Sequence, residues 1–286
     1  MIKLALIGHP LSHSLSKVIH EAAMRDLHII GTYDLLDTEP ENLINQVKYL
    51  KSQNYLGFNV TIPHKVPISL FLDKVDNNAD IALCANTVKI DSDKNFYGYN
   101  TDIYGFQAAL DSKNKTNLHD KKAAIIGAGG AARAVLISLG QLGYRNIDIY
   151  VRNIINASKM VNQIRSHFKD ISFNLIQIEN MNTLNDVQLL VNCTPVGMRN
   201  NSMDISPVKF NILSSLPKNS IVYDLIYNPY KTVLLKEAQN LGLKTINGLD
   251  MLIYQAQKAF EIWTGKIPDF KIMKIAALES MLENNI

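Results

Sequence analysis

The chain has 286 residues and a formal net charge of +3, with 47% hydrophobic and 19% charged residues. This composition is typical of a globular enzyme and excludes a disordered or fibrous chain, and the length accommodates two ordinary domains. The small, scattered positive charge argues against nucleic acid as a partner and suits a small anionic ligand better.

Cysteine usage and hydropathy bear on the compartment. Cys84 and Cys193 lie far apart, without CxxC or His/Cys ligand spacing, which predicts free buried thiols in a reducing compartment and no metal site. The apolar run at the N-terminus stops at His9 and Pro10, too early for a signal peptide, and no other apolar run is long enough to span a bilayer. We therefore expect a cytoplasmic protein without membrane contact.

The first elements alternate between strands and helices. An apolar run over 2–8 predicts a buried strand, and the serine-rich segment 12–16 (Ser-His-Ser-Leu-Ser) follows it. An amphipathic helix is then predicted from apolar residues at helical spacing: Leu15, Val18, Ile19 and Ala22. Capping is the ordinary role for such serines, although hydroxyls beside free helix-start amides also suit a carboxylate or polyhydroxylated ligand. A strand over 31–37 and a helix over 41–50 come next.

The segment 57–65 reads GFNVTIPHK and is predicted to begin as a strand. Its apolar residues alternate with polar ones: Phe58, Val60 and Ile62. Pro63 ends the ladder because proline has no backbone N–H. Lys65 is therefore expected just past the carboxyl end of a strand, where ligands bind in open α/β sheets, whereas His64 is interpreted as a bystander rather than a metal ligand.

A carboxylate follows the next strands. The predicted elements are a helix and a two-stranded hairpin: residues 77–85, 86–90 and 95–100. Asn86 opens the hairpin near the same face, where forming a turn is the ordinary role of an asparagine. Asp102 ends the polar segment 98–102. Since Lys65 and Asp102 would lie at two strand ends, they are candidates for an acid/base pair.

The second half of the chain carries a glycine-rich loop. A helix over 104–110 and a polar linker over 111–122 precede a strand over 123–126. That strand runs into 127–133, Gly-Ala-Gly-Gly-Ala-Ala-Arg, and then into a helical pattern. Strand, G-x-G-x-x-A and helix in this order predict a dinucleotide site, because glycines let the backbone approach a pyrophosphate and helix-start amides meet its charge.

The end of the next strand, 147–151, bears on the choice of nicotinamide cofactor. NAD sites usually place Asp or Glu there for the ribose hydroxyls. This chain has Arg152, with Lys159 one or two turns into the following helix. A guanidinium suits a 2′-phosphate, so we expect NADP; the alternative is a solvated arginine in a loop.

The remaining pattern completes an α/β fold with a doubly wound sheet. Its further strands are expected over 171–177, 189–194, 220–225 and 244–246. Polar segments at 192–197 and 224–227 sit at two of these strand ends, where a crevice is expected. Two helices, 249–264 and 270–283, close the chain.

Together these motifs resemble the shikimate dehydrogenase family over nearly the whole chain. The matching motifs are the serine segment 12–16, Asn59-Val60-Thr61-Ile62-Pro63-His64-Lys65, Asn100-Thr101-Asp102, the glycine loop, 192–197, and Gly248-Leu249-Asp250-Met251-Leu252 with Gln255. The resemblance implies reversible reduction of 3-dehydroshikimate to shikimate with NADPH, on the pathway to aromatic amino acids. It also implies a small-molecule substrate and a monomer or homodimer.

The resemblance further implies a domain organisation. An N-terminal α/β substrate-binding and catalytic domain is expected over 1–103, completed by C-terminal helices from about 250 to 286. A Rossmann-type NADP-binding domain is expected over 104–249.

Roles carry over by position. Lys65 and Asp102 would handle the proton. The residues expected to hold substrate are Ser14, Ser16, Thr61, Asn86, Tyr227 and Gln255. The residues expected to hold NADP are Gly127, Ala128, Gly129, Gly130 and Ala131 at the pyrophosphate, Arg152 at the 2′-phosphate, and Leu225 and Gly248 at the nicotinamide end.

Three positions depart from the family pattern, and two rival functions stay open. Lys17 replaces a frequent proline, Val151 a frequent asparagine, and Asn153 the usual threonine. A quinate or quinate/shikimate dehydrogenase would differ only in how the pocket treats one ring hydroxyl. A non-catalytic metabolite sensor would not need both Lys65 and Asp102.

Overall fold

The structure is a computed structural model that describes residues 1–12, 14–113, 121–199 and 202–283. The chain divides into two compact units, with residues 1–105 and 252–285 in unit 1 and residues 106–251 in unit 2. The boundaries fall inside two helices, α4 (Thr101–Lys113) and α9 (Gly248–Thr264). Each unit is therefore described by itself.

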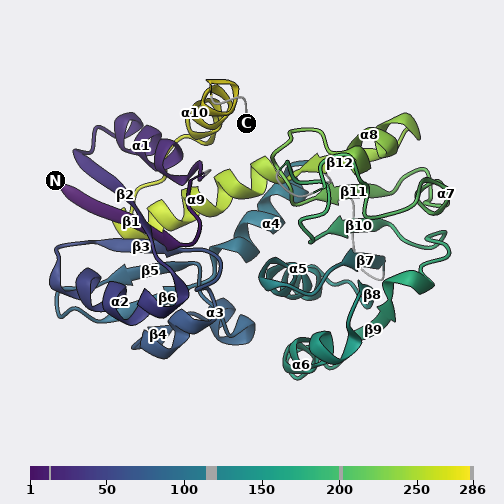
Figure 1. The fold of residues 1–286 in the computed structure, drawn as a ribbon, viewed down its shortest axis with the longest axis horizontal. Coiled ribbons are helices and arrows are strands. Elements are labelled where there is room, and N and C mark those ends of the chain that lie inside the picture. Colours follow the sequence, from purple (N-terminus) through teal and green to yellow (C-terminus); the bar gives the residue numbers. More distant parts are fainter. Residues whose placement is uncertain (13, 114–120, 200–201, 284–286) are drawn as a thin grey trace. The chain divides into compact units, whose positions relative to one another are not determined.

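In unit 1 the described residues form a six-stranded mixed sheet in the order β2-β1-β3-β5-β6-β4 (Figure 1). Its strands are β1 (Ile2–Gly8), β2 (Gly31–Asp37), β3 (Gly57–Val60), β4 (Lys74–Val75), β5 (Thr87–Ile90) and β6 (Phe96–Tyr99). β1 pairs in parallel with both β2 and β3, whereas β5 runs antiparallel to β3 and β6. The predicted first strand and the predicted hairpin are confirmed.

Helices cover the sheet of unit 1 because its strands alternate buried side chains between two faces. One face, which includes Ala5, Phe58 and Val88, packs with α2 (Leu43–Ser52). Further helices of the unit include α1 (Ser16–Asp26), the short α3 (Asn77–Ala82) and α10 (Phe270–Glu283), and α1 packs with α10.

Helix α9 approaches the sheet closely at a glycine. The Trp263 indole donates a hydrogen bond from Nε1 to the Val88 carbonyl at 2.9 Å. A Cβ on Gly57 would lie only 2.2 Å from that Nε1 atom, so the contact requires glycine. Helix α9 is thereby fixed to the centre of the N-terminal sheet.

In unit 2 the described residues form a six-stranded parallel sheet in the order β12-β11-β10-β7-β8-β9 (Figure 1). Its strands are β7 (Lys122–Ile126), β8 (Asn146–Val151), β9 (Ser172–Gln177), β10 (Leu189–Asn192), β11 (Ile221–Asp224) and β12 (Lys244–Asn247). Its helices are α5 (Gly130–Gln141), α6 (Ile154–Arg165), α7 (Phe210–Leu213) and α8 (Val233–Asn240). The order reverses at β7, so the predicted doubly wound fold is confirmed.

Two predicted boundaries are wrong, and both lie beside candidate residues. β3 ends at Val60, and Ile62 is 70% exposed instead of continuing the buried alternation. The chain turns there, since the backbone N–H of His64 donates to the Thr61 carbonyl at 2.8 Å. Asp102 lies in the first turn of α4 rather than at a strand end.

Smaller differences concern the linker and a cysteine. Helix α4 extends to Lys113, so the described part of the predicted linker is partly helical, and residues 114–120 lie outside the described residues. Both cysteines are free, as predicted, but Cys193 is half-buried rather than buried because it follows the end of β10. No helix in the described part of the chain is long and apolar enough to span a membrane.

Candidate active site

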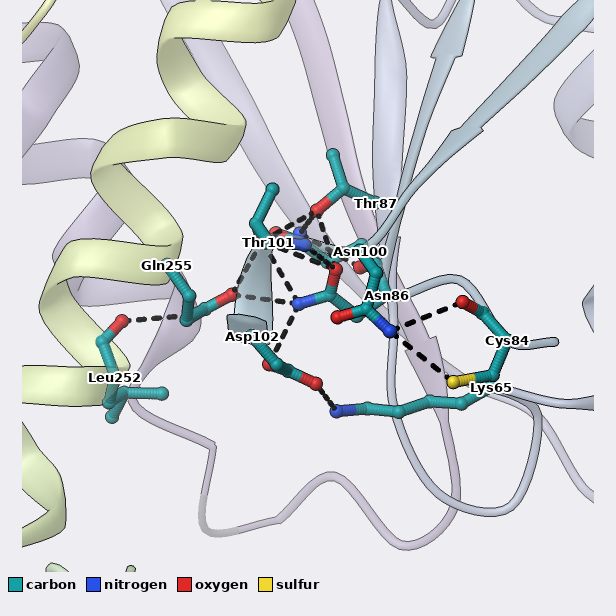
Figure 2. Close-up of polar contacts among 10 residues, drawn as sticks. Lys65, Cys84, Asn86, Thr87, Asn100, Thr101, Asp102, Leu252 and Gln255 are labelled. Atoms are coloured by element: carbon teal, nitrogen blue, oxygen red, sulfur yellow. Dashed lines mark hydrogen bonds and ion pairs between the residues drawn. The ribbon is translucent and has the colours of Figure 1, made fainter. Parts of the chain in front are cut away.

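An ion pair between Lys65 and Asp102 forms the centre of the site in unit 1 (Figure 2). The Lys65 ammonium donates from Nζ to Asp102 Oδ2 at 2.6 Å. The two side chains are 20% and 11% exposed, so the pair is largely desolvated yet reachable. The carboxylate also lies in the first turn of α4, where the helix dipole favours negative charge.

Asn86 orients the carboxylate of this pair. Its Oδ1 accepts a hydrogen bond from the Thr101 backbone N–H at 2.7 Å, which caps the start of α4. A backbone N–H can only donate, so the amide orientation is determined and Nδ2 faces Asp102 Oδ1 at 2.8 Å (Figure 2). Both carboxylate oxygens of Asp102 are thereby engaged, one by an amide and one by an ammonium.

Gln255 reaches the same cluster from α9. Its Oε1 accepts from Asn86 Nδ2 at 3.3 Å and from Thr101 Oγ1 at 3.4 Å. Its Nε2 donates to the Leu252 carbonyl at 2.8 Å, which fixes the amide (Figure 2). The fold therefore brings together four of the candidate residues, namely Lys65, Asn86, Asp102 and Gln255.

The remaining candidates of unit 1 are half-buried and lie on loops or at the start of a helix. Ser16 is the first residue of α1, and its backbone N–H donates to Ser14 Oγ at 3.3 Å. The N-cap position is Leu15, with no side-chain cap hydrogen bond among the described residues, so neither serine is the N-cap itself, although the Ser14 hydroxyl satisfies the first N–H of the helix. Thr61 lies one residue past β3, and its methyl group would lie 2.2 Å from a Cβ on Gly8. His13 of the serine motif lies outside the described residues.

The glycine loop of unit 2 leaves backbone open to a ligand. Gly127 has a φ of +98°, which side chains rarely adopt, and a Cβ there would lie 2.8 Å from Thr194. Apart from the adjoining backbone, no heavy atom of the described residues lies within 4 Å of a Cβ added at Gly129 or Gly130. Since α5 begins at Gly130, free helix-start amides adjoin this open backbone, which suits a pyrophosphate flanked by Ala128 and Ala131.

Arg152 directly follows β8 and is exposed. The next residue, Asn153, caps α6 by accepting from the Asn156 backbone N–H at 3.0 Å. Within the described residues Arg152 has no ion-pair partner, so its guanidinium is available to an anion. The same exposed position also fits the alternative, an arginine that only contacts solvent.

The last three candidates, Leu225, Tyr227 and Gly248, lie beyond β11 and at the start of α9. A Cβ on Gly248 would lie 2.0 Å from the Leu225 carbonyl oxygen, so only glycine fits. The Gly248 backbone N–H donates to the Ile226 carbonyl at 3.2 Å. Tyr227 is half-buried, and desolvation raises the pKa of its phenol.

Comparison with known proteins places this geometry in a family. The shikimate dehydrogenase substrate binding domain matches residues 6–88, and the shikimate 5′-dehydrogenase C-terminal domain matches residues 248–278. A shikimate dehydrogenase (NADP(+)) of Methanococcus maripaludis strain C6 is 42% identical over 276 residues, covering 96% of this chain and 95% of the relative. The chain belongs to the shikimate dehydrogenase family.

Solved structures similar to this member of the shikimate dehydrogenase family agree over its whole length. A shikimate dehydrogenase crystallised with NADP+ is 39% identical with a TM-score of 0.89, covering 98% of this chain and 96% of that one. A quinate dehydrogenase from Corynebacterium glutamicum in complex with NAD is 28% identical with a TM-score of 0.89, covering 97% and 99%. The fold alone therefore does not distinguish the two substrates.

Two further polar residues of this shikimate dehydrogenase family member contact the candidate residues or lie beside them, one in each unit. Neither of them was assigned a role from the sequence. Thr101 contacts Asn86 and Gln255. Its position between Asn100 and Asp102 in the matching motif could have identified it. In unit 2 Asp224 accepts from Thr232 Oγ1 at 2.7 Å and Asn192 Nδ2 at 3.0 Å.

Asp224 is a fully buried carboxylate at the end of β11. Desolvation raises its pKa to about 6, opposed by hydrogen bonds from Thr232, the Ile226 backbone N–H and Asn192. It thereby ties the ends of β10 and β11 together beside Leu225. Among the described residues, no group of three or more His, Cys, Asp or Glu side chains could hold a metal ion.

Proposed function

We propose that this chain catalyses the reversible NADPH-linked reduction of 3-dehydroshikimate to shikimate, on the chorismate route to aromatic amino acids. It is an NADP-dependent oxidoreductase acting on a CH–OH group. The observation that carries the proposal is the Lys65–Asp102 pair at 2.6 Å, held by Asn86. A pair of this kind suits proton transfer to and from a ring hydroxyl.

The chemistry follows from where charge develops. Reducing a ketone builds negative charge on its oxygen, and bound NADPH supplies the hydride. A cationic donor within hydrogen-bond reach stabilises that charge more in the transition state than in the substrate, which selects Lys65 as the acid. Asp102 orients the lysine and the reacting hydroxyl, and in the oxidative direction the pair accepts the proton.

Substrate binding is assigned to half-buried and buried polar side chains of unit 1 and, from the family resemblance, to Tyr227. Ser14 and Ser16 would bind the carboxylate, as hydroxyl donors beside the start of α1. The other proposed ligands of the hydroxyls and carboxylate are Thr61, Asn86, Gln255 and Tyr227. Unit 1 accordingly corresponds to the proposed substrate-binding and catalytic domain.

NADP binding is assigned to the strand ends of unit 2. The open backbone from Gly127 to Ala131 would hold the pyrophosphate, and Arg152 the 2′-phosphate. Leu225 and Gly248 would adjoin the nicotinamide. Unit 2 accordingly corresponds to the proposed NADP-binding domain.

One assay tests the function against its rivals. NADP reduction is followed at 340 nm with shikimate, then with quinate, and each again with NAD. We expect turnover with shikimate and NADP; preference for quinate would support the alternative that the C. glutamicum relative suggests. Absence of turnover with every pair would favour a metabolite sensor and overturn the proposal.

We also propose that the protein is cytoplasmic and works as a monomer or homodimer. The basis is the chemistry of its family, whose substrates and cofactor are small molecules. Light scattering after gel filtration distinguishes a monomer near 32.1 kDa from larger assemblies.

A further inference from the structure

A row of buried polar groups lies behind the Lys65–Asp102 pair. The Tyr33 phenol of β2 donates to Asn59 Oδ1 of β3 at 2.7 Å. β1 separates these strands, so the phenol reaches across β1 to make this contact. Asn59 Nδ2 in turn donates to the Asn86 carbonyl at 3.1 Å and to Thr87 Oγ1 at 3.0 Å. All four side chains are at most 5% exposed.

The direction of each hydrogen bond is determined by groups that have only one role. The Asn86 carbonyl can only accept, so the Asn59 NH2 group faces it and Asn59 Oδ1 is left to accept from Tyr33. Thr87 Oγ1 accepts a hydrogen bond from Asn59, and its hydroxyl can donate one to Asn86 Oδ1 at 3.3 Å. The amide of Asn86 that contacts Asp102 is therefore supported from behind.

The outer end of the row is the Tyr33 phenol. Burial raises the pKa of the Tyr33 phenol, and a side-chain hydrogen bond from Ser16 partly opposes this. The phenol therefore stays protonated and donates to Asn59. Its ring is held by His20, stacked at 4.5 Å between ring centroids with 10° between planes.

We propose that Tyr33 is a positioning residue that acts through Asn59 and Thr87 on the Asn86–Asp102–Lys65 group. Tyr33 is fully buried, so it acts only through these neighbours. The inference rests on the proposed function, because the residues it positions are those assigned to proton transfer. Buried polar networks of this kind specify one geometry when every member is satisfied.

A second tyrosine of unit 1 provides a matched control. The Tyr55 hydroxyl donates to Asp34 Oδ2 at 2.7 Å, and Tyr55 is 6% exposed. Its hydroxyl has no link to Asn59, Asn86 or Asp102 within the described residues. Tyr33→Phe and Tyr55→Phe therefore each remove one phenol hydrogen bond, buried for Tyr33 and partly buried for Tyr55, and only the first belongs to the row.

The first measurement separates positioning from stability. Tyr33→Phe should lower kcat about 10-fold, the equivalent of one lost hydrogen bond, with a smaller change in KM. Tyr55→Phe should stay within about 2-fold of wild-type kcat while losing a similar amount of thermal stability. Equal kcat values for the two variants, in a wild type that oxidises shikimate, would overturn the proposal and leave the function standing.

The second measurement repeats Tyr33→Phe in a Lys65→Ala background. With no ammonium to position, the added substitution should change kcat by less than about 2-fold. A full repetition of the 10-fold loss would show a general structural effect and contradict the proposal.

The third measurement needs no turnover, so it remains decisive if the wild type proves inactive with shikimate. Asparagine side-chain amide signals are recorded by NMR on selectively labelled protein, with Asn86 assigned from its loss in Asn86→Asp. The Asn86 signals should shift in Tyr33→Phe and not in Tyr55→Phe. Unchanged Asn86 signals in Tyr33→Phe would show that Tyr33 does not act on Asn86, whichever reaction the protein catalyses, and would overturn the proposal.

Discussion

At the scale of single residues, the proton-transfer role of Lys65 makes a kinetic prediction. General acid/base help is worth about 10² to 10⁴ in rate, or roughly 3 to 5 kcal/mol, so Lys65→Ala should lower kcat by that order while substrate affinity falls much less. The loss in Lys65→Ala plus Asp102→Ala should be well below the sum of the single losses, because the two act as one unit. Steady-state kinetics of the two single variants and the double variant measures these losses. Near-wild-type turnover in Lys65→Ala would contradict the mechanism.

Arg152 makes a prediction about cofactor choice. Its guanidinium is exposed after β8 and has no described ion-pair partner, and only NADP carries a 2′-phosphate. Arg152→Ala should weaken NADP binding and leave NAD nearly unchanged. Calorimetric titration with each cofactor measures this, with Lys159→Ala as a neighbouring control for general charge; equal weakening for both cofactors would show that Arg152 does not contact the phosphate.

His20 makes a prediction about acid stability. It is fully buried and neither ring nitrogen has a described hydrogen-bond partner. Burial lowers its pKa to about 3, which the nearby Asn59 side chain opposes only weakly. Below about pH 6.5 the His20 side chain therefore binds a proton in the unfolded chain but not in the folded chain. The free energy of unfolding consequently falls as the pH is lowered from about 6.5 toward 3.

His20→Phe keeps a ring against Tyr33 and removes the titrating group. From pH 6.5 to pH 4 the wild type should lose about 3 kcal/mol more stability than His20→Phe, at 1.36 kcal/mol per pH unit. Urea unfolding at the two pH values measures this, with the exposed His167→Gln as control. Parallel losses in wild type and His20→Phe would exclude His20 as the cause.

At the scale of elements, two glycines at helix starts should respond in opposite ways. Gly248 begins α9 in contact with the Leu225 carbonyl, so Gly248→Ala should cost about 1 to 3 kcal/mol of stability through overpacking. Gly130 begins α5 in open space, so Gly130→Ala should preserve stability or raise it by up to about 1 kcal/mol while weakening NADP binding. Thermal unfolding without and with NADP separates the two effects; a stable Gly248→Ala would contradict the contact.

Element boundaries were predictable where they depended on local chemistry and not where they depended on distant partners. β7 and α5 are signalled by an apolar run followed by glycines, and both appear where expected. The start of α4 was missed because its first amide is satisfied by Asn86, fifteen residues earlier in the chain. No local capping pattern reports such a partner.

At the scale of the whole molecule, the proposed substrate ligands come from opposite ends of the chain. Gln255 reaches Asn86 at 3.3 Å although 169 positions separate them. Alanine at Ser14, Ser16 or Gln255 should mainly raise KM, because these groups bind ground and transition state alike. Calorimetric shikimate affinity checks this, and unchanged affinity in all three variants would show that the pocket is misplaced.

The sequence by itself determined the α/β class and the glycine loop, because these follow from periodicity and from short-range rules for glycine and proline, whereas most of the candidate site residues came from the family resemblance. Only the tertiary structure decided that Asn86 holds both the start of α4 and the Asp102 carboxylate, and that Tyr33 lies behind it across β1. The physical reason is that buried polar groups must find partners wherever the fold brings them, and partners distant in sequence leave no periodic signal.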